Sequence, residues 1–374
     1  MNRTSYIGMI AALALVIFAG AISSDWVSSQ AFVSPAITTP ALEVATSPVE
    51  SVPTTIPAKE VATTTQNTSK NKKAAQVQIA PIETSSSGPP VARVATQASY
   101  DSAAATLRGA LVNILCYAPT GSGLRSISGS GVFVDPKGII LTNAHIGQYF
   151  LFANRGVSCT IRTGSPAVDS YKAVPIYISP EWIKKNSSAI AQDAPTGTGE
   201  YDFAFLAIER SATNSALPSL FPSVSLALTP IQLGTPIVIA SYGAQFLESS
   251  QIQSFLFPTV VFGSVKDIFT FATSTIDVLS LGGSPAAQEG SSGGGVASAV
   301  DGALVATITT STVSGATDTR TLSAITASYI RAEYARETGN SLELLLTRPL
   351  LEVVADFVPK ISPLEAILTA NLPR

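Results

Sequence analysis

The sequence predicts an all-β domain, either a barrel or a sandwich, that ends in C-terminal helices. From about residue 99 onward, short apolar segments alternate with Gly, Pro, Asp and Asn, which is typical of strands joined by tight turns. We expect no helices between these segments, and this argues against a parallel α/β sheet. Hydrophobic residues make up 46% of the 374 residues, enough to bury a large core.

Each predicted strand is a short apolar run bounded by turn residues. The runs cover residues 111–118, 127–134, 139–142, 157–162, 171–178, 202–208, 236–241, 259–267, 275–279, 294–298, 303–309 and 321–325.

Only the C-terminal part of the sequence has a helical pattern. Ser323 is a candidate N-cap for a helix that Gly339 would end. A second helical stretch over residues 342–357 contains Pro349, which should kink or divide it. Its apolar residues predict that the tail, residues 341–374, packs on the second half of the domain or mediates assembly.

Residues 1–98 differ in composition from the rest of the chain. Residues 6–22 are apolar and uncharged, so residues 1–25 are predicted to be either a signal peptide or an N-terminal membrane anchor. Residues 26–98 are rich in Pro, Ser and Thr and are predicted to be a disordered linker. Both interpretations of the N-terminal segment place the domain, residues 99–340, outside the cytoplasm.

Composition excludes several classes of function. The net charge is -3 and the longest basic run is Lys72-Lys73, so no basic surface for nucleic acid is expected. One histidine and two cysteines are too few for a His-based or Cys-rich metal site, and no cofactor is predicted. Any mechanism that needs an imidazole base must therefore use His145.

Three segments carry residues suited to catalysis, although each alone has an ordinary structural explanation. The first, residues 129–145, is a hairpin that ends in His145. The second, residues 201–208, begins an apolar strand with Asp202. The third, residues 289–296, is a glycine-rich turn that could present Ser292 beside backbone N–H groups.

Together the three segments hold a nucleophile, a base and an acid in the order His, Asp, Ser. Here the sequence resembles the trypsin-like (chymotrypsin-fold) serine peptidases, especially their HtrA/DegP-like branch. The resemblance covers about residues 105–335. It rests on Thr142-Asn-Ala-His145, on Asp202-Phe-Ala-Phe-Leu and on Gly290-Ser-Ser292-Gly-Gly.

The resemblance implies two six-stranded antiparallel β-barrels with the active site between them. It implies that Ser292 is the nucleophile, His145 the general acid/base and Asp202 the orienting carboxylate. The N–H groups of Gly290 and Ser292 would form the oxyanion hole. Ala286, six residues before the nucleophile, would lie at the base of the S1 pocket, which favours small or medium apolar P1 side chains over basic ones.

The sequence departs from the family pattern at several points. Ser291 stands where zymogens of the family carry Asp, and Gly295 stands where the family commonly has proline. We also expect no PDZ domain in the short tail. The leading hypothesis is a serine endopeptidase that acts on exposed or unfolded polypeptides. The alternative is a catalytically silent domain of the same fold that binds peptides or a partner outside the cytoplasm.

Two further alternatives concern the fold family and the cysteines. The pattern Gly-x-Ser-x-Gly also occurs in α/β-hydrolases, but those enzymes place the histidine after the serine, and none follows Ser292 here. An esterase of the trypsin-like fold remains chemically possible. Cys116 and Cys159 lie in predicted strands and are either a disulfide or two buried thiols.

Overall fold

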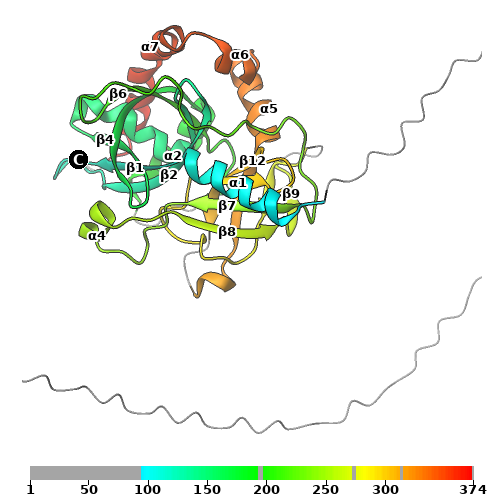
Figure 1. The fold of residues 1–374 in the computed structure, drawn as a ribbon. Coiled ribbons are helices and arrows are strands. Elements are labelled where there is room, and N and C mark those ends of the chain that lie inside the picture. Colours follow the sequence, from blue (N-terminus) through cyan, green and yellow to red (C-terminus); the bar gives the residue numbers. More distant parts are fainter. Residues whose placement is uncertain (1–93, 193–196, 272–274, 312–314, 373–374) are drawn as a thin grey trace, which may run out of the picture. The chain divides into compact units, whose positions relative to one another are not determined.

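Strands β1–β6 form a closed antiparallel barrel in the order β1-β2-β3-β6-β5-β4 (Figure 1). The apolar runs form strands because buried residues occupy almost every position of β3 and the first half of β6. The strands are β1 (Leu111–Tyr117), β2 (Ile127–Asp135), β3 (Ile139–Thr142), β4 (Ser158–Thr163), β5 (Val168–Ile178) and β6 (Ala204–Ser211).

The computed structural model describes residues 94–372 except 193–196, 272–274 and 312–314. The predicted signal peptide or anchor, and nearly all of the predicted linker, lie outside the described residues. Within the part of the chain that is described, no helix is both long enough and apolar enough to cross a membrane.

A disulfide joins Cys116 to Cys159. The two residues face each other in the register of β1 and β4, so the bond fastens neighbouring strands of the barrel. Of the two alternatives for the cysteines, the structure has the disulfide.

The remaining strands form one seven-stranded antiparallel sheet, which corrects the expectation of a second six-stranded barrel. Its order is β8-β7-β11-β12-β13-β10-β9, and it is a curled half-barrel. The strands are β7 (Pro236–Ser241), β8 (Thr259–Ser264), β9 (Asp267–Phe269), β10 (Val278–Ser280), β11 (Gly295–Ser298), β12 (Leu304–Ser311) and β13 (Leu322–Thr326).

The predicted strand 259–267 ends early, at Ser264 of β8, and β9 begins at the last residue of the predicted run. β8 pairs with β7, whereas β9 pairs with β10 at the opposite edge of the sheet. Between these two strands the Val265 N–H donates to Thr235 O and the Lys266 N–H donates to Ser280 O. The two edge strands, β8 and β9, are therefore consecutive in the chain. They do not pair with each other, so the sheet curls without closing into a barrel.

The fold is mainly β rather than all-β, because several helices that the sequence analysis did not predict lie before and between the strands. They are α1 (Gln97–Ala110), α2 (Ala144–Gly147), α3 (Pro180–Asn186) and α4 (Ser249–Ser254), with the short 3₁₀ segments η1 (Gln148–Arg155), η2 (Ser187–Ala191) and η3 (Thr317–Thr319). The predicted loop 179–199 contains α3 and η2.

Helix α1 begins inside the predicted linker and packs against β11 and β7, and Figure 1 shows it beside β7. Thr96 caps it through a reciprocal hydrogen-bond pair with Ser99. Its buried residues Ala103, Leu107 and Ala110 recur at helical spacing. A Cβ on Gly295 would lie 2.7 Å from Leu107 Cδ1, so glycine at this position makes room for the helix.

The chain ends in α5 (Ala327–Thr338), α6 (Leu342–Thr347) and α7 (Leu350–Thr369). Thr326 caps α5, not Ser323, because Ser323 lies within β13. Gly339 ends α5 in the left-handed conformation, and Pro349 separates α6 from α7. Helix α7 packs against β5, η1 and α3, which places the tail on the first barrel rather than on the second sheet.

Candidate active site

His145 and Asp202 are joined by two hydrogen bonds. His145 lies in the single turn of α2 directly after β3, where its own N–H donates to Asp202 Oδ1 at 3.0 Å. Its ring Nδ1 is 2.8 Å from Asp202 Oδ2. The carboxylate side chain is 6% exposed and the imidazole 32% exposed. With the proton on Nδ1 held by Asp202, Nε2 is left as the proton acceptor.

A strained turn places Asp202. Tyr201 has φ 60°, a conformation that aromatic residues seldom adopt. Its N–H donates to the hydroxyl of Tyr329 at 2.9 Å. Lys185 Nζ lies 4.2 Å from the centre of its ring, and Arg336 Cζ lies 5.3 Å from it. Backbone strain of this kind persists only where surrounding contacts hold it, and here they fix the residue next to Asp202.

Thr309 is a third partner of this pair, and the sequence analysis did not find it. Its hydroxyl donates to Asp202 Oδ2 at 2.8 Å from the buried strand β12. The side chain of Asn143 adds a bond to the Asp202 backbone oxygen at 2.9 Å. The only sequence signal for Thr309 was a hydroxyl residue in an apolar strand, which does not identify a partner 107 residues away.

Ser292 contacts β12 but does not bond to the imidazole. Its Oγ donates to the backbone oxygen of Thr309 at 3.4 Å. No hydrogen bond joins Ser292 to His145, both of which are among the described residues. The structure thus brings His145 and Asp202 into direct contact, whereas the Ser292 hydroxyl is hydrogen-bonded to the backbone oxygen of Thr309.

The turn formed by residues 287–292 is fixed by hydrogen bonds to its backbone carbonyl groups. Every backbone oxygen from residue 287 to residue 292 accepts a hydrogen bond within the protein, and four of the six bonds come from distant segments. The pairs, oxygen first, are Ala287 with Arg320 Nη1, Gln288 with Ser291 N, Glu289 with Ala244 N, Gly290 with Ser130 Oγ, Ser291 with Gly294 N and Ser292 with Ser130 N.

The same turn has two backbone N–H groups, one residue apart, that lack a partner among the described residues. Among the described residues, neither the Gly290 N–H nor the Ser292 N–H donates a hydrogen bond. Gly290 has φ 88°, and a Cβ there would lie 2.7 Å from Tyr242 O, so only glycine fits. Two unpaired donors that flank a serine hydroxyl form an arrangement suited to binding a negatively charged oxygen.

Comparison with known proteins agrees with the geometry. Residues 129–306 match the family model described as the trypsin-like peptidase domain. These residues form a trypsin-like peptidase domain. The domain contains His145, Asp202 and Ser292, and a peptidase domain implies polypeptide substrates. No curated protein matches the sequence significantly.

The chain is also similar in fold to solved structures of Rv3671c from M. tuberculosis. A serine-to-alanine mutant in an inactive form is 17% identical, covers 69% of this chain and 97% of its own, and gives a TM-score of 0.41. The active form of the Rv3671c protease is 18% identical, covers 69% of this chain and 95% of its own, and gives a TM-score of 0.40.

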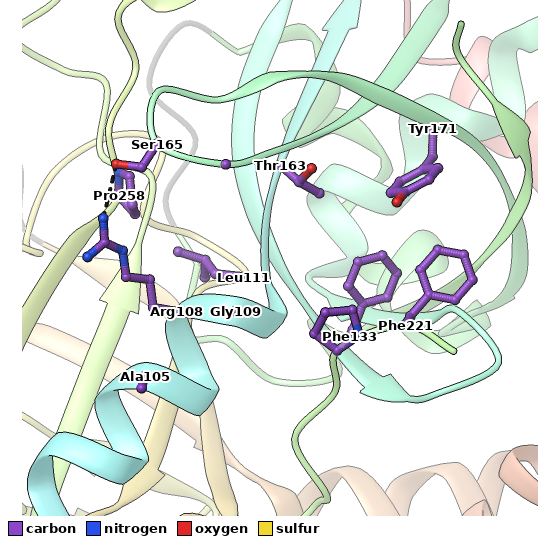
Figure 2. A pocket seen from close by; sticks show the side chains of 12 residues that line it. Ala105, Arg108, Gly109, Leu111, Phe133, Thr163, Ser165, Tyr171, Phe221 and Pro258 are labelled. Carbon is purple, nitrogen blue, oxygen red and sulfur yellow. Dashed lines mark hydrogen bonds between the residues drawn. The ribbon is translucent and has the colours of Figure 1, made fainter. Parts of the chain in front are cut away.

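A cavity of about 540 Å³ lies elsewhere in the domain, beside the end of α1 (Figure 2). The rings of Phe133, Tyr171 and Phe221 line one side, and Arg108, bonded to Ser165, lies on the other. None of the residues of the 287–292 turn lines it. Across the described ranges, no three His, Cys, Asp or Glu residues are grouped so as to hold a metal ion.

Proposed function

We propose that the chain is a serine endopeptidase that hydrolyses exposed or unfolded polypeptides through Ser292, His145 and Asp202. The observation that carries the proposal is the turn at 287–292. All of its carbonyl oxygens are bonded within the protein, whereas the Gly290 and Ser292 N–H groups are unpaired. Backbone donors fixed before the reaction stabilise developing negative charge without reorganising.

The mechanism follows from these positions. Ser292 Oγ leaves Thr309 O and attacks the substrate carbonyl carbon as its proton passes to His145 Nε2. The carbonyl oxygen becomes an oxyanion held by the N–H groups of Gly290 and Ser292. The C–N bond then breaks, the amine leaves with the proton from Nε2, and water hydrolyses the acyl-enzyme by the reverse use of His145. Asp202 stabilises the imidazolium in both steps.

Hydrolysis of casein at pH 8 tests this function. The full chain is compared with Ser292→Ala and with His145→Gln, and all three are treated with a fluorophosphonate that labels activated serines. We expect hydrolysis and labelling by the wild type alone. Cleavage that persists in Ser292→Ala would remove Ser292 as the nucleophile. Activity that is flat from pH 8 to pH 4 would contradict an imidazole base.

A catalytically silent, peptide-binding domain is the second candidate. It is favoured by one observation, the hydrogen bond from Ser292 Oγ to Thr309 O in place of one to His145. Such a domain would bind unfolded casein and would neither hydrolyse it nor react with the fluorophosphonate. The same experiment therefore separates the two candidates.

We propose further that the domain functions outside the cytoplasm, secreted or anchored by residues 1–25, and that it lies in the HtrA/DegP-like branch. The Cys116–Cys159 disulfide supports an oxidising compartment. Ala286 is fully buried and carries no charge, which supports small or medium apolar P1 side chains. Fractionation of the host cell tests the location of the protein, and sequencing of casein fragments tests the P1 preference.

A further inference from the structure

Ser130 lies on β2 of the first barrel but contacts the turn that precedes Ser292. Its hydroxyl donates to Gly290 O at 2.8 Å, and its N–H donates to Ser292 O at 2.8 Å. The hydroxyl also accepts from the Tyr242 N–H at 2.8 Å, at the end of β7. The side chain is fully buried. One serine of the barrel therefore binds two segments of the seven-stranded sheet.

The backbone of Ser130 is itself fixed. Its carbonyl oxygen accepts from the hydroxyl of Thr142 at 2.7 Å, on the neighbouring strand β3. A Cβ on Gly293 would lie 1.9 Å from the same oxygen, so the turn passes in close contact with β2. Rigid strands of the barrel thus hold the Ser130 hydroxyl in one place.

The two residues that Ser130 holds are those whose N–H groups are unpaired. Each is fixed on both sides. The peptide plane before Gly290 is held by the Ala244 N–H, and the plane before Ser292 is held by the Gly294 N–H. Ser130 holds the plane after each residue. Without its hydroxyl, the plane after Gly290 would be held only by the bond from the Ser291 N–H to Gln288 O at 3.2 Å, within the turn itself. Glycine has the widest choice of backbone conformations, so the turn would be less firmly fixed at this residue.

We propose that Ser130 is a positioning residue that fixes the oxyanion-binding N–H groups of Gly290 and Ser292 from the opposite barrel. The proposal rests on the proposed function. Ser130 touches no reacting atom, so it acts on the transition state through the turn. Loss of its hydroxyl should weaken binding of the oxyanion and leave ground-state binding of the peptide almost unchanged.

The test compares Ser130→Ala with Ser128→Ala in the full chain. Ser128 lies two residues earlier on the same face of β2, and its hydroxyl accepts from Asn113 Nδ2 rather than contacting the turn. For each protein we would measure kcat and KM on fluorescent casein, the affinity for a peptide boronic acid with alanine at P1, and thermal unfolding. The boronate adds to the serine and places an oxygen where the oxyanion forms.

We expect Ser130→Ala to lower kcat by roughly tenfold or more, because a buried carbonyl and a buried N–H lose their partner. Boronate affinity should fall by a similar factor while KM stays within twofold, and Ser128→Ala should match the wild type. Ser130→Cys, which keeps a weak donor of similar shape, should be intermediate and decides the case if the alanine variant does not fold.

Two results would overturn the proposal. One is wild-type kcat and boronate affinity in Ser130→Ala. The other is a variant with lowered thermal stability and lowered kcat that binds the boronate as tightly as the wild type, which would make the role of Ser130 structural only. A wild-type chain that neither hydrolyses casein nor reacts with the fluorophosphonate would refute the proposed function, and this proposal with it.

Discussion

The hydroxyl of Thr309 donates to Asp202 Oδ2 at 2.8 Å, the same carboxylate oxygen that lies 2.8 Å from His145 Nδ1. The backbone oxygen of Thr309 accepts from Ser292 Oγ. One residue of β12 therefore contacts both the acid and the nucleophile of the candidate site. Its side chain and its backbone should have separable effects.

Replacement of Thr309 by valine keeps the shape of the side chain and removes its hydroxyl. We expect kcat/KM on casein to fall about tenfold, since hydrogen bonds to charged groups contribute roughly 1.5–3 kcal/mol. Thr309→Ser, which keeps the hydroxyl, should retain most of the activity. A loss confined to the serine variant, with full activity in the valine variant, would show that the methyl group, and not the bond to Asp202, is what matters.

Gly293→Ala should abolish activity. Gly293 has φ 84°, and an added Cβ would lie 1.9 Å from Ser130 O, so the turn must move away from the barrel. Gly302→Ala is the matched control, because Gly302 has φ 75° but no heavy atom within 4 Å of an added Cβ. The control should cost about 1–2 kcal/mol for the left-handed backbone and keep full activity. Urea unfolding and casein assays measure both; similar behaviour of the two variants would contradict the close contact.

The stability of Glu337→Gln relative to the wild type should increase as pH rises. Burial raises the pKa of the Glu337 carboxyl, although Tyr177 and Ser179 donate hydrogen bonds to it at 2.6 and 2.8 Å. The folded chain therefore keeps this proton to a higher pH than the unfolded chain, whose glutamate pKa is about 4.3. Stability is lost as pH rises through that window, and the glutamine avoids this loss.

Glu343→Gln provides the control of opposite sign. A hydrogen bond from Arg331 lowers the pKa of the Glu343 carboxyl. The stability that Glu343 contributes is present above the pKa of this carboxyl in the unfolded chain. It is lost as pH falls through the lower pKa of the carboxyl in the folded chain. Relative to the wild type, melting temperatures between pH 4 and pH 8 should rise for Glu337→Gln and fall for Glu343→Gln. The same sign in both variants would show that neither carboxyl titrates as described.

Removal of the disulfide should destabilise the first barrel. The bond closes a separation of 43 residues that includes His145, and such a link contributes roughly 2–4 kcal/mol. Cys116→Ala with Cys159→Ala should unfold at lower urea than the wild type and match the reduced wild-type chain. Unchanged unfolding under reducing conditions would contradict this expectation.

Arg320→Met should lower both stability and activity. The guanidinium is buried, 5% exposed, and donates to Ala287 O, Gln245 Oε1 and Gly315 O. The variant leaves these acceptors without that donor, which we expect to cost at least about 2 kcal/mol and to loosen the turn before Ser292.

Arg348→Gln, which removes ion pairs on the exposed face of the tail, should leave the melting temperature and casein hydrolysis unchanged. Equal effects of the two variants would argue against a specific role for Arg320.

The sequence by itself determined what depends on local pattern. Strands β3 and β7 begin and end where the apolar runs predicted, and Gly339 and Pro349 end helices as expected, because turn residues act on the backbone next to them. It also determined the order and chemical types of His145, Asp202 and Ser292. Helix α1 had a local signal in Thr96 and in its apolar spacing, although the sequence analysis did not predict it.

The tertiary structure decided what depends on partners distant in sequence. Ser130 and Gly290 are 160 residues apart, and Thr309 and Asp202 are 107 apart. A buried hydroxyl must find a partner, but composition and periodicity do not say which one. The same holds for β8 and β9, which follow one another in the chain yet pair at opposite edges of the sheet. Pairing between distant segments is set by packing of the whole chain, and only the folded structure shows it.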